Sequence, residues 1–209
     1  MIVKLQYPEG ATPLDPNELA GLKPKHITTQ GELDQLEQAN ISSGLRWLSR
    51  QRGQVLTDDF VITLHKRLFG DVWDWAGTFR KTGKNIGIDP RHIQVELRGL
   101  LHDSQYWTDN KTYSPLEAAV RFHHRLVKIH LFPNGNGRHA RIMADAILSD
   151  VFSVRRQVSW DKFADLNRGG FLVHRSNTEN RNETQIRNTR NVRAGCEGHS
   201  PSDTQTVFG

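Results

Sequence analysis

Apolar residues recur every three to four positions through most of the chain between residues 30 and 151. This spacing places them on one face of a helix, so each run predicts an amphipathic helix with a buried side. The predicted helices cover residues 30–52, 57–69, 91–107, 115–130 and 137–151. The pattern therefore predicts a mostly α-helical domain.

Local signals mark where two of these helices begin and end. Thr57 is a good N-cap for the helix that Gly70 ends, because its hydroxyl can accept a hydrogen bond from a free backbone N–H group. Ser114 is the N-cap of a later helix; Pro115 suits its first turn, and Glu117 completes a capping box. One face of that helix carries Leu116, Ala119, Val120, His123, Leu126, Val127 and His130. The last residue of this face therefore falls at the inner edge of the helix C-terminus.

Three segments lack the helical pattern. Residues 1–29 are rich in Pro, Gly and Lys, which predicts an extended arm before a domain at residues 30–174. Residues 85–88 predict a short strand, with Gly83 offering a turn before it, and so a small β-hairpin flap. Residues 175–209 hold few large apolar side chains and cannot offset their ordering entropy, which predicts a disordered polar tail.

The net charge of +5 limits the classes of binding partner that the sequence favours, but it does not identify one. A mildly basic protein favours anionic partners, among which nucleotides, nucleic acid and membrane surfaces all qualify. No apolar run has the length needed to cross a bilayer, so no membrane partner is predicted. Aromatic and basic residues do not interleave as they do on a single-strand-binding platform, so nucleic acid is not predicted either.

The cysteine content and the first residues bear on the compartment. The single cysteine, Cys196, excludes an intrachain disulfide, which fits a reducing environment. The stretch MIVKLQYPEG lacks the basic and then apolar pattern of a signal peptide. We therefore expect a cytoplasmic protein; the sequence does not indicate its oligomeric state.

The densest candidate chemistry is the stretch 130–141, which reads HLFPNGNGRHAR. Glycines in its turn allow the backbone to approach a ligand, and N–H groups at the start of the next helix form an anion cradle. Arg138 and Arg141 are three residues apart and share a helix face, so two guanidinium groups can meet a polyphosphate. His130, across the turn, can accept a proton from an attacking hydroxyl. This pattern indicates nucleotidyl or phosphoryl transfer.

The same residues have a structural interpretation. A Gly-Asn-Gly turn often only separates two helices, and a histidine at a helix C-terminus often only interacts with the helix dipole. Trp73 and Trp75 fit the core or the wall of a nucleotide pocket, and the core is the commoner place for tryptophan at such positions. From the residues alone both interpretations of the turn stay open.

The stretch resembles the signature of the Fic family, which has the Fido fold and the motif H-P-F-x-D/E-G-N-G-R-x-x-R. His130, Phe132, Gly135, Asn136, Gly137, Arg138 and Arg141 match it at the right spacing. The upstream LHKRLFGDVWDWAGTFR is similar to the family's segment ending in W-A-G-x-x-R, and the resemblance covers roughly residues 57–148. The segments WAGTFRKTGKNIG and RFHHRLVKIH look closest to a subgroup called mobile mystery protein B. Its members are Fic-like proteins of mobile bacterial elements.

The resemblance implies a helical Fido bundle that transfers AMP from ATP to a Ser, Thr or Tyr hydroxyl of an unidentified target protein. By this analogy His130 is the catalytic base, and Phe132 anchors the loop. Gly135, Asn136 and Gly137 hold phosphates, Arg138 acts on the phosphates, and Arg141 binds the far end of the triphosphate. The flap, around Lys84, Asn85, Ile86 and Gly87, docks the target by strand addition.

Two departures from the motif keep alternatives open. Leu131 replaces the usual proline, which alters local rigidity. Asn134 replaces the acidic residue that normally binds Mg²⁺; its amide oxygen is a candidate ligand, without the charge that hard cations favour. The alternatives are a degenerate Fic module that binds nucleotide or a protein partner without turnover, and a phosphotransferase using the same site.

Many Fic proteins carry an inhibitory helix with the motif S/T-x-x-x-E-G/N, whose glutamate pairs with the second arginine of the signature. Here LDQLEQAN offers Glu37 within the predicted helix at residues 30–52, although Leu33 and Gln38 depart from that motif. We expect Glu37 to be an inhibitory glutamate that reaches Arg141. Members of the subgroup usually end in further apolar helices, so the tail at 175–209 is either a natural extension or the product of a shifted reading frame.

Overall fold

The computed structural model describes residues 13–51, 53–154 and 158–160. Within these residues the regular structure is helical, and the only β pairing is the isolated bridge between Leu22 and Trp73. The helices are α1 (Pro16–Ala20), α2 (Gln30–Leu48), α3 (Asp58–Phe69), α4 (Ile93–Asp109), α5 (Pro115–Ile129) and α6 (Asn136–Asp150), with a 3-10 turn η1 (Pro90–His92) before α4. The prediction of a mostly α-helical fold is confirmed.

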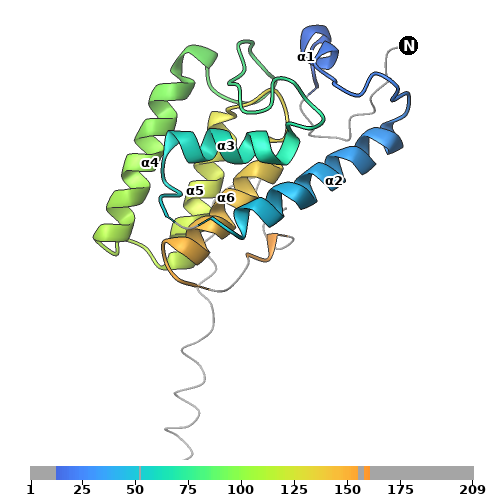
Figure 1. The fold of residues 1–209 in the computed structure, drawn as a ribbon. Helices are drawn as coiled ribbons and strands as arrows, with labels where there is room; N and C mark the ends of the chain where they lie inside the picture. The colour runs from blue at the N-terminus through green and yellow to red at the C-terminus, as the bar shows by residue number, and fades with distance from the viewer. Residues whose placement is uncertain (1–12, 52, 155–157, 161–209) are drawn as a thin grey trace, which may run out of the picture. The chain divides into compact units, whose positions relative to one another are not determined.

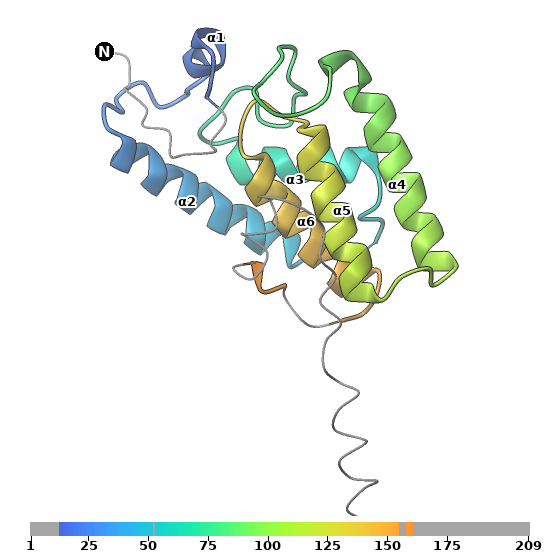
Figure 2. The same ribbon diagram turned by 180° about the vertical axis from the view of Figure 1, so that it is seen from behind.

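The helices α5 and α6 form an antiparallel pair at the centre of the described residues, joined by the loop that carries the candidate motif. Helix α3 crosses this pair on one side, in front of it in Figure 1 and behind it in Figure 2. Helix α4 lies beside α5, and α2 packs on α3. The loop between α5 and α6 therefore lies at one end of the bundle, where the segment between α3 and α4 also passes.

The predicted helix boundaries rest on local hydrogen bonds. Thr57 Oγ1 accepts a hydrogen bond from the backbone N–H of Phe60 at 3.2 Å, as expected for the N-cap of α3. Ser114 caps α5 in the same way, but the predicted capping box is incomplete. The carboxylate of Glu117 instead pairs with Arg121, one turn along the helix, because a full positive charge attracts it more than a backbone N–H group does.

The buried faces follow the predicted patterns with one shift. The predicted stripe of α4, which is Ile93, Leu97, Leu100 and Leu101, is buried throughout. On α5, however, Leu116 is 50% exposed, because the face that meets α4 and α6 is rotated from the predicted one. The buried residues of α5 are Ala118, Ala119, Phe122, Leu126 and Ile129.

Residues 13–29, the described part of the predicted arm, are more ordered than an extended arm. It contains the short helix α1, and both Leu22 and Ile27 are buried in the core. The bridge between Leu22 and Trp73 fixes it beside the segment that follows α3. Helix α2 begins at Gln30 as predicted but ends at Leu48, before residue 52.

The predicted strand at residues 85–88 is absent, so the flap is a loop and not a β-hairpin. A strand is stable only where a neighbour takes its backbone hydrogen bonds. Here no described strand lies alongside, and the carbonyl groups of Thr82 and Ile88 accept hydrogen bonds from the Arg80 side chain instead. The predicted tail at 175–209, together with residues 161–174 of the predicted domain, lies outside the described residues.

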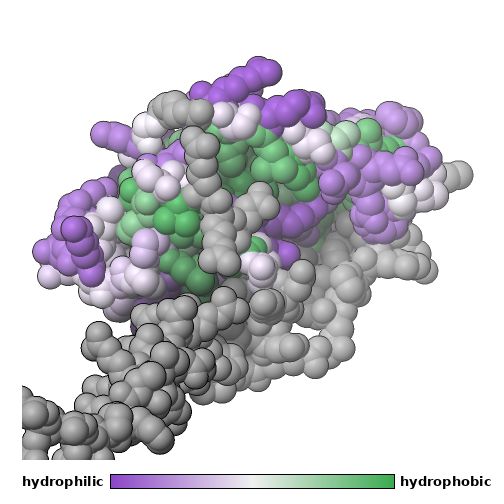
Figure 3. Space-filling view, turned by 90° about the horizontal axis from the view of Figure 1, so that it is seen from below, coloured by the Kyte–Doolittle hydropathy of each residue, from purple (hydrophilic) through white to green (hydrophobic). Residues whose placement is uncertain are grey.

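The surface of the described residues is mixed. Figure 3 shows apolar side chains gathered on one face, with hydrophilic side chains around them. The large apolar side chains that are exposed are Leu45, Ile86, Val95, Tyr106 and Leu116. Among the described helices none combines the length and the apolar character that crossing a bilayer requires.

Candidate active site

The loop between α5 and α6 is closed by its own asparagine. The Asn136 Oδ1 atom accepts a hydrogen bond from the Phe132 N–H group at 2.9 Å, and Asn136 Nδ2 donates to the Phe132 carbonyl at 2.7 Å. Both residues are buried. The Asn136 side chain is therefore occupied within the loop, which leaves its backbone N–H group, but not its amide, for a phosphate.

Glycine is required at the start of α6. Gly135 is the N-cap, with a φ of 77°, and a Cβ atom there would lie 2.8 Å from the ring of Phe69. No side chain caps this end of α6, so the first N–H groups of a 15-residue helix keep their positive dipole end for an anion. The start of α6 therefore has uncapped backbone N–H groups, which is the feature from which the sequence predicts an anion cradle.

His130 ends α5 in the left-handed region, with φ 58° and ψ 67°. Its ring is buried, and neither Nδ1 nor Nε2 has a hydrogen-bond partner. Burial, and to a smaller extent the positive charges of Arg80 and Lys84, lower the pKa of this imidazole to about 4. Because its pKa lies below 7, the His130 ring is neutral at pH 7, and one ring nitrogen has an unused lone pair that can accept a proton. A buried polar ring without a hydrogen-bond partner is costly to keep, so it calls for a functional explanation.

His65, on α3, connects two loops around the motif. Its Nδ1 atom accepts a hydrogen bond from the Gly77 N–H group at 3.0 Å, so the ring proton lies on Nε2, 3.1 Å from the Asn134 carbonyl. The ring also stacks on Phe132 with centroids 3.7 Å apart. His65 therefore fixes the backbone of the motif loop relative to the turn that follows Trp75.

Buried histidines make the stability of the fold depend on pH. Burial lowers the pKa of His139 to about 4, and it lowers the pKa of His65 well below the ordinary value. The unfolded chain therefore binds more protons than the folded one below pH 6.5, so stability falls as the pH falls. We expect the free energy of unfolding to decrease by about 1.4 kcal/mol per pH unit for each such histidine.

Denaturant unfolding at pH 7, 6 and 5 measures this decrease. The variant His102→Ala is a suitable control, because it removes a histidine whose side chain is 85% exposed and lies outside the core. A free energy of unfolding that stays constant from pH 7 to pH 5 contradicts the prediction.

The structure places Glu37 against the motif, but on a different arginine from the one predicted. Glu37 Oε2 lies 2.5 Å from Arg138 Nη1, and Glu37 Oε1 accepts a hydrogen bond from Trp73 Nε1 at 2.7 Å. The Arg138 guanidinium also lies over the ring of Phe69. The predicted contact with Arg141 is wrong, because Arg141 is exposed and its Nε donates to the Gly137 carbonyl one turn back.

Asn134 does not present a ligand set for a resident metal ion. Its Oδ1 atom accepts a hydrogen bond from the Gly135 N–H group at 2.5 Å, and its carbonyl faces His65. No group of three or more His, Cys, Asp or Glu side chains suited to a metal is found among the described residues. The residues present around Asn134 therefore do not fit a protein-held Mg²⁺, which favours carboxylate oxygens.

The flap, residues 82–88, lies over His130. A Cβ atom on Gly87, whose φ is 106°, would lie 2.7 Å from the His130 Cβ atom. The flap is also joined to α1, since Lys84 pairs with Glu18 and the Thr82 hydroxyl lies 3.2 Å from Asp15 Oδ2. The flap therefore packs directly against the candidate base.

Two residues at this site have functional contacts that no sequence pattern predicted. Arg80 and His65 both contact the motif loop, and both stand in segments that the resemblance already covered, WAGTFR and LHKRLFG. The signal was their place in those segments, but the contacts join residues that lie 50 and 69 positions apart. No local pattern predicts such contacts. Trp73, which was expected in the core, is buried and also holds Glu37.

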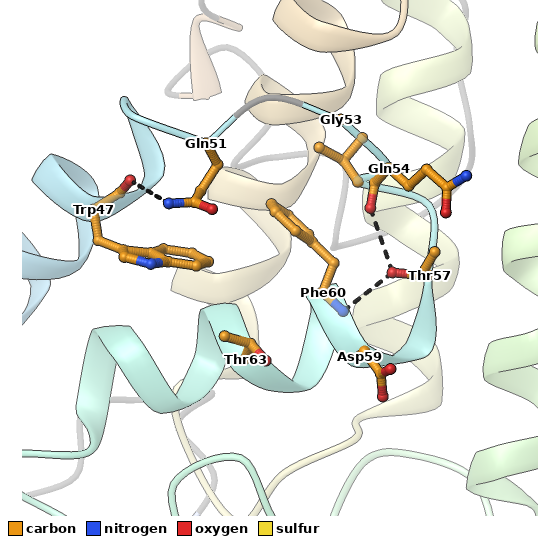
Figure 4. A pocket seen from close by; sticks show the side chains of 9 residues that line it. Trp47, Gln51, Gly53, Gln54, Thr57, Asp59, Phe60 and Thr63 are labelled. Carbon is orange, nitrogen blue, oxygen red and sulfur yellow. Dashed lines mark hydrogen bonds between the residues drawn. The ribbon is translucent and has the colours of Figure 1, made fainter.

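A separate hollow of about 280 Å³ lies between the end of α2 and the start of α3. Figure 4 shows the rings of Trp47 and Phe60 facing it, with Gln51 donating to the Trp47 carbonyl. Its lining consists of Trp47, Gln51, Gly53, Gln54, Val55, Thr57, Asp59, Phe60 and Thr63. None of these residues belongs to the motif, so this hollow is distinct from the candidate site.

The fold is that of a FIC domain. The structure is similar to the solved N-terminal FIC domain of the Bep8 protein of Bartonella sp. 1-1C, with a TM-score of 0.55 and 17% identity, over 66% of this chain and 73% of that one. In sequence, residues 55–148 match the profile of the Fic/DOC family. The match covers less than half of the chain, so this stretch is similar to the Fic/DOC family.

Curated relatives match over the same part of the chain. The chain is 28% identical over 109 residues to the protein adenylyltransferase fic-1 of Caenorhabditis elegans, covering 48% of this chain. It is 28% identical over 124 residues to the protein adenylyltransferase Fic of Nematostella vectensis, covering 56% of this chain. The matched stretches span 20% and 29% of those relatives' lengths, so the similarity concerns one part of each relative.

Proposed function

We propose that this protein transfers AMP from ATP to a hydroxyl group of another protein. The observation that carries the proposal is the buried His130 ring with both nitrogens unpartnered, one loop away from the uncapped N-terminus of α6. The Fic/DOC match and the relatives named protein adenylyltransferase support the same reaction. ATP is the proposed donor, and the target protein is unidentified.

The proposed reaction divides the work between the base and the cradle. One ring nitrogen of His130 takes the proton of the target hydroxyl while the hydroxyl oxygen attacks the α-phosphorus of ATP. A new O–P bond forms, and the bond between the α-phosphorus and the oxygen that bridges it to the β-phosphate breaks. Pyrophosphate leaves with the electron pair. The backbone N–H groups of Gly137 and Arg138, together with the Arg138 guanidinium, stabilise the phosphate charge, and Arg141 extends from the same helix toward the far phosphates.

Glu37 is proposed to inhibit this reaction. Its carboxylate occupies the Arg138 guanidinium that the phosphates require, and Trp73 holds the carboxylate in place. A carboxylate and a triphosphate compete for the same cation, since both are anions that pair with arginine. Nucleotide therefore binds productively only when the contact between Glu37 and Arg138 opens.

One assay tests the proposed function. The protein and its Glu37→Gly variant are incubated with cell extract and ATP labelled at either the α- or the γ-phosphate. Protein label from the α-phosphate alone, lost in a His130 variant, supports AMP transfer. Label from the γ-phosphate alone supports phosphorylation, and no His130-dependent label supports a module that only binds. Either of the last two outcomes overturns the proposal.

Magnesium enters the proposed reaction with its substrate, as MgATP. We expect Asn134→Asp to lower the Mg²⁺ concentration that gives half-maximal activity roughly several-fold, because a carboxylate attracts Mg²⁺ more strongly than a neutral amide does. The measurement is a Mg²⁺ titration of AMP transfer at fixed ATP. The exposed Asn110→Asp serves as the control for a change in net charge. An unchanged Mg²⁺ requirement in Asn134→Asp contradicts a metal near this position.

The wording of the two motif segments supports a narrower assignment as well. We propose that the protein belongs with the Fic-like proteins of mobile bacterial elements called mobile mystery protein B, and that it acts in the cytoplasm. The segments that support the subgroup are WAGTFRKTGKNIG and RFHHRLVKIH, and the single cysteine supports a reducing compartment.

A further inference from the structure

Arg80 is a buried cation with an unusual set of partners. Its side chain is 3% exposed, yet the hydrogen bonds of its guanidinium go to four backbone carbonyl oxygens and not to a carboxylate. Buried charges in proteins are ordinarily paired with an opposite charge or a metal. An arginine remains protonated in proteins, so these carbonyl groups must compensate a full positive charge.

Two of the four carbonyls belong to the end of α5. Arg80 Nε donates to the His130 carbonyl at 2.6 Å, and Nη2 donates to the Ile129 carbonyl at 3.3 Å. The backbone N–H of Arg80 also donates to the Leu131 carbonyl at 2.9 Å. The last carbonyls of a helix lack partners within it and form the negative end of the helix dipole, which explains why a cation is stable there.

The other two carbonyls belong to the first and last residues of the flap. Arg80 Nη1 donates to Thr82 O at 2.9 Å, and Nη2 donates to Ile88 O at 2.5 Å. One guanidinium therefore closes the flap loop and joins it to the helix end that carries His130. Gly87 fits into this arrangement only because it has no side chain: a Cβ atom there would lie 2.7 Å from both Arg80 Nη2 and His130 Cβ.

We propose that Arg80 is a positioning residue for His130: its guanidinium holds the left-handed turn at the end of α5 and fixes the flap on top of it. This proposal rests on the proposed function in assigning the base to His130. The planar fork is the necessary feature, since four acceptors in different directions require several N–H groups held in fixed geometry. A lysine in the same place keeps the charge but loses that geometry.

The charges that face His130 give the proposal an independent readout. Arg80 approaches from the segment after α3 and Lys84 from the flap, and both lower the pKa of the His130 ring, after the larger effect of burial. Lys84 is paired with Glu18 of α1, and Asp89 lies near Arg80 at the far end of the flap. Loosening the flap hydrates the ring, so its pKa is expected to rise from about 4 toward the ordinary value of 6.5.

Two variants of Arg80 distinguish the effect of the guanidinium geometry from the effect of its charge. Two glycine variants distinguish a displaced flap from a general loss of folding. Arg80→Lys keeps the charge, and Arg80→Met removes both charge and donors. Gly87→Ala displaces the flap from His130, whereas Gly83→Ala is its matched control, because a Cβ atom on Gly83 has no neighbour within 4 Å. The readouts are amide hydrogen exchange at positions 80 and 130, whose N–H groups donate to the Leu131 and Leu126 carbonyls, and the titration of the His130 ring by NMR, assigned with His130→Asn.

We expect exchange of these two amides to increase by about tenfold or more in Arg80→Lys, Arg80→Met and Gly87→Ala, because both N–H groups lie at the turn that the Arg80 side chain holds. The His130 ring should titrate at higher pH in the same three variants and stay unchanged in Gly83→Ala. Where AMP transfer is measurable, kcat falls while KM for ATP changes little, and the acid limb of the rate profile moves to higher pH.

Wild-type exchange and an unshifted His130 titration in both Arg80→Lys and Gly87→Ala overturn the proposal. If an Arg80 variant does not fold, the two glycine variants decide by the same readouts. If the wild-type protein transfers no AMP, the proposed function fails alone, and the exchange and titration still judge the role of Arg80.

Discussion

Replacing His130 by asparagine is expected to lower the rate of the proposed AMP transfer by about 10²- to 10⁴-fold, the usual contribution of a general base. Asparagine is the informative substitution because His130 has a φ of 58°, and asparagine tolerates this left-handed conformation better than alanine does. The loop and the anion cradle should therefore persist, so ATP binding should change little while the chemical step is lost.

The measurement is incorporation of α-labelled phosphate into target protein, with ATP binding followed separately by calorimetry. The control is His124→Asn, which changes an exposed histidine of the same helix α5 and is expected to keep full activity. A His130→Asn variant that keeps wild-type rates removes His130 from the reaction. A variant that loses ATP binding in parallel with activity indicates a structural role instead.

Replacing Glu37 by glycine is expected to raise the proposed AMP transfer by about 10- to 100-fold. The charge-assisted hydrogen bond between Glu37 and Arg138 must break before phosphates can take the guanidinium, and such bonds contribute about 1.5–3 kcal/mol. The Glu37 side chain is only 12% exposed, which limits the screening by water that weakens surface pairs. The gain should appear mainly as tighter productive binding of ATP.

The matched control is Gln38→Gly on the next position of α2. It carries the same cost of about 1 kcal/mol for glycine in a helix interior, but the Gln38 side chain is exposed. Automodification and ATP affinity are compared among the wild type, both glycine variants and Glu37→Gln, which removes the charge while keeping a good helix former. Equal activity in Glu37→Gly and the wild type shows that this pair does not inhibit.

The contact between Glu37 and Arg138 also illustrates what a motif can and cannot predict. The helix at Gln30 followed from local spacing, and the resemblance to the inhibitory motif implied a glutamate of this helix near the signature. The choice of partner did not, because it depends on how α2 packs on α3 and on Trp73, which donates to the other carboxylate oxygen. Arg138 and Arg141 carry the same charge at similar positions on α6, so composition and spacing treat them alike.

The sequence by itself determined the presence of helices α2 to α6 and the N-caps of α3 and α5, because these depend on residues a few positions apart. Thr57 and Ser114 as N-caps, the stripe of α4 and the glycine at the start of α6 are local features of this kind. It also determined the place of the Fic signature between two helices.

Only the tertiary structure decided the state of the site. The predicted flap strand gave way to a loop because Arg80, and not a neighbouring strand, takes the carbonyls at its ends. The neutral His130 ring likewise depends on burial beneath Gly87 and on charges from the flap and from the segment after α3. Hydrogen-bond competition and desolvation act between residues far apart in the chain, so a linear pattern cannot fix their outcome.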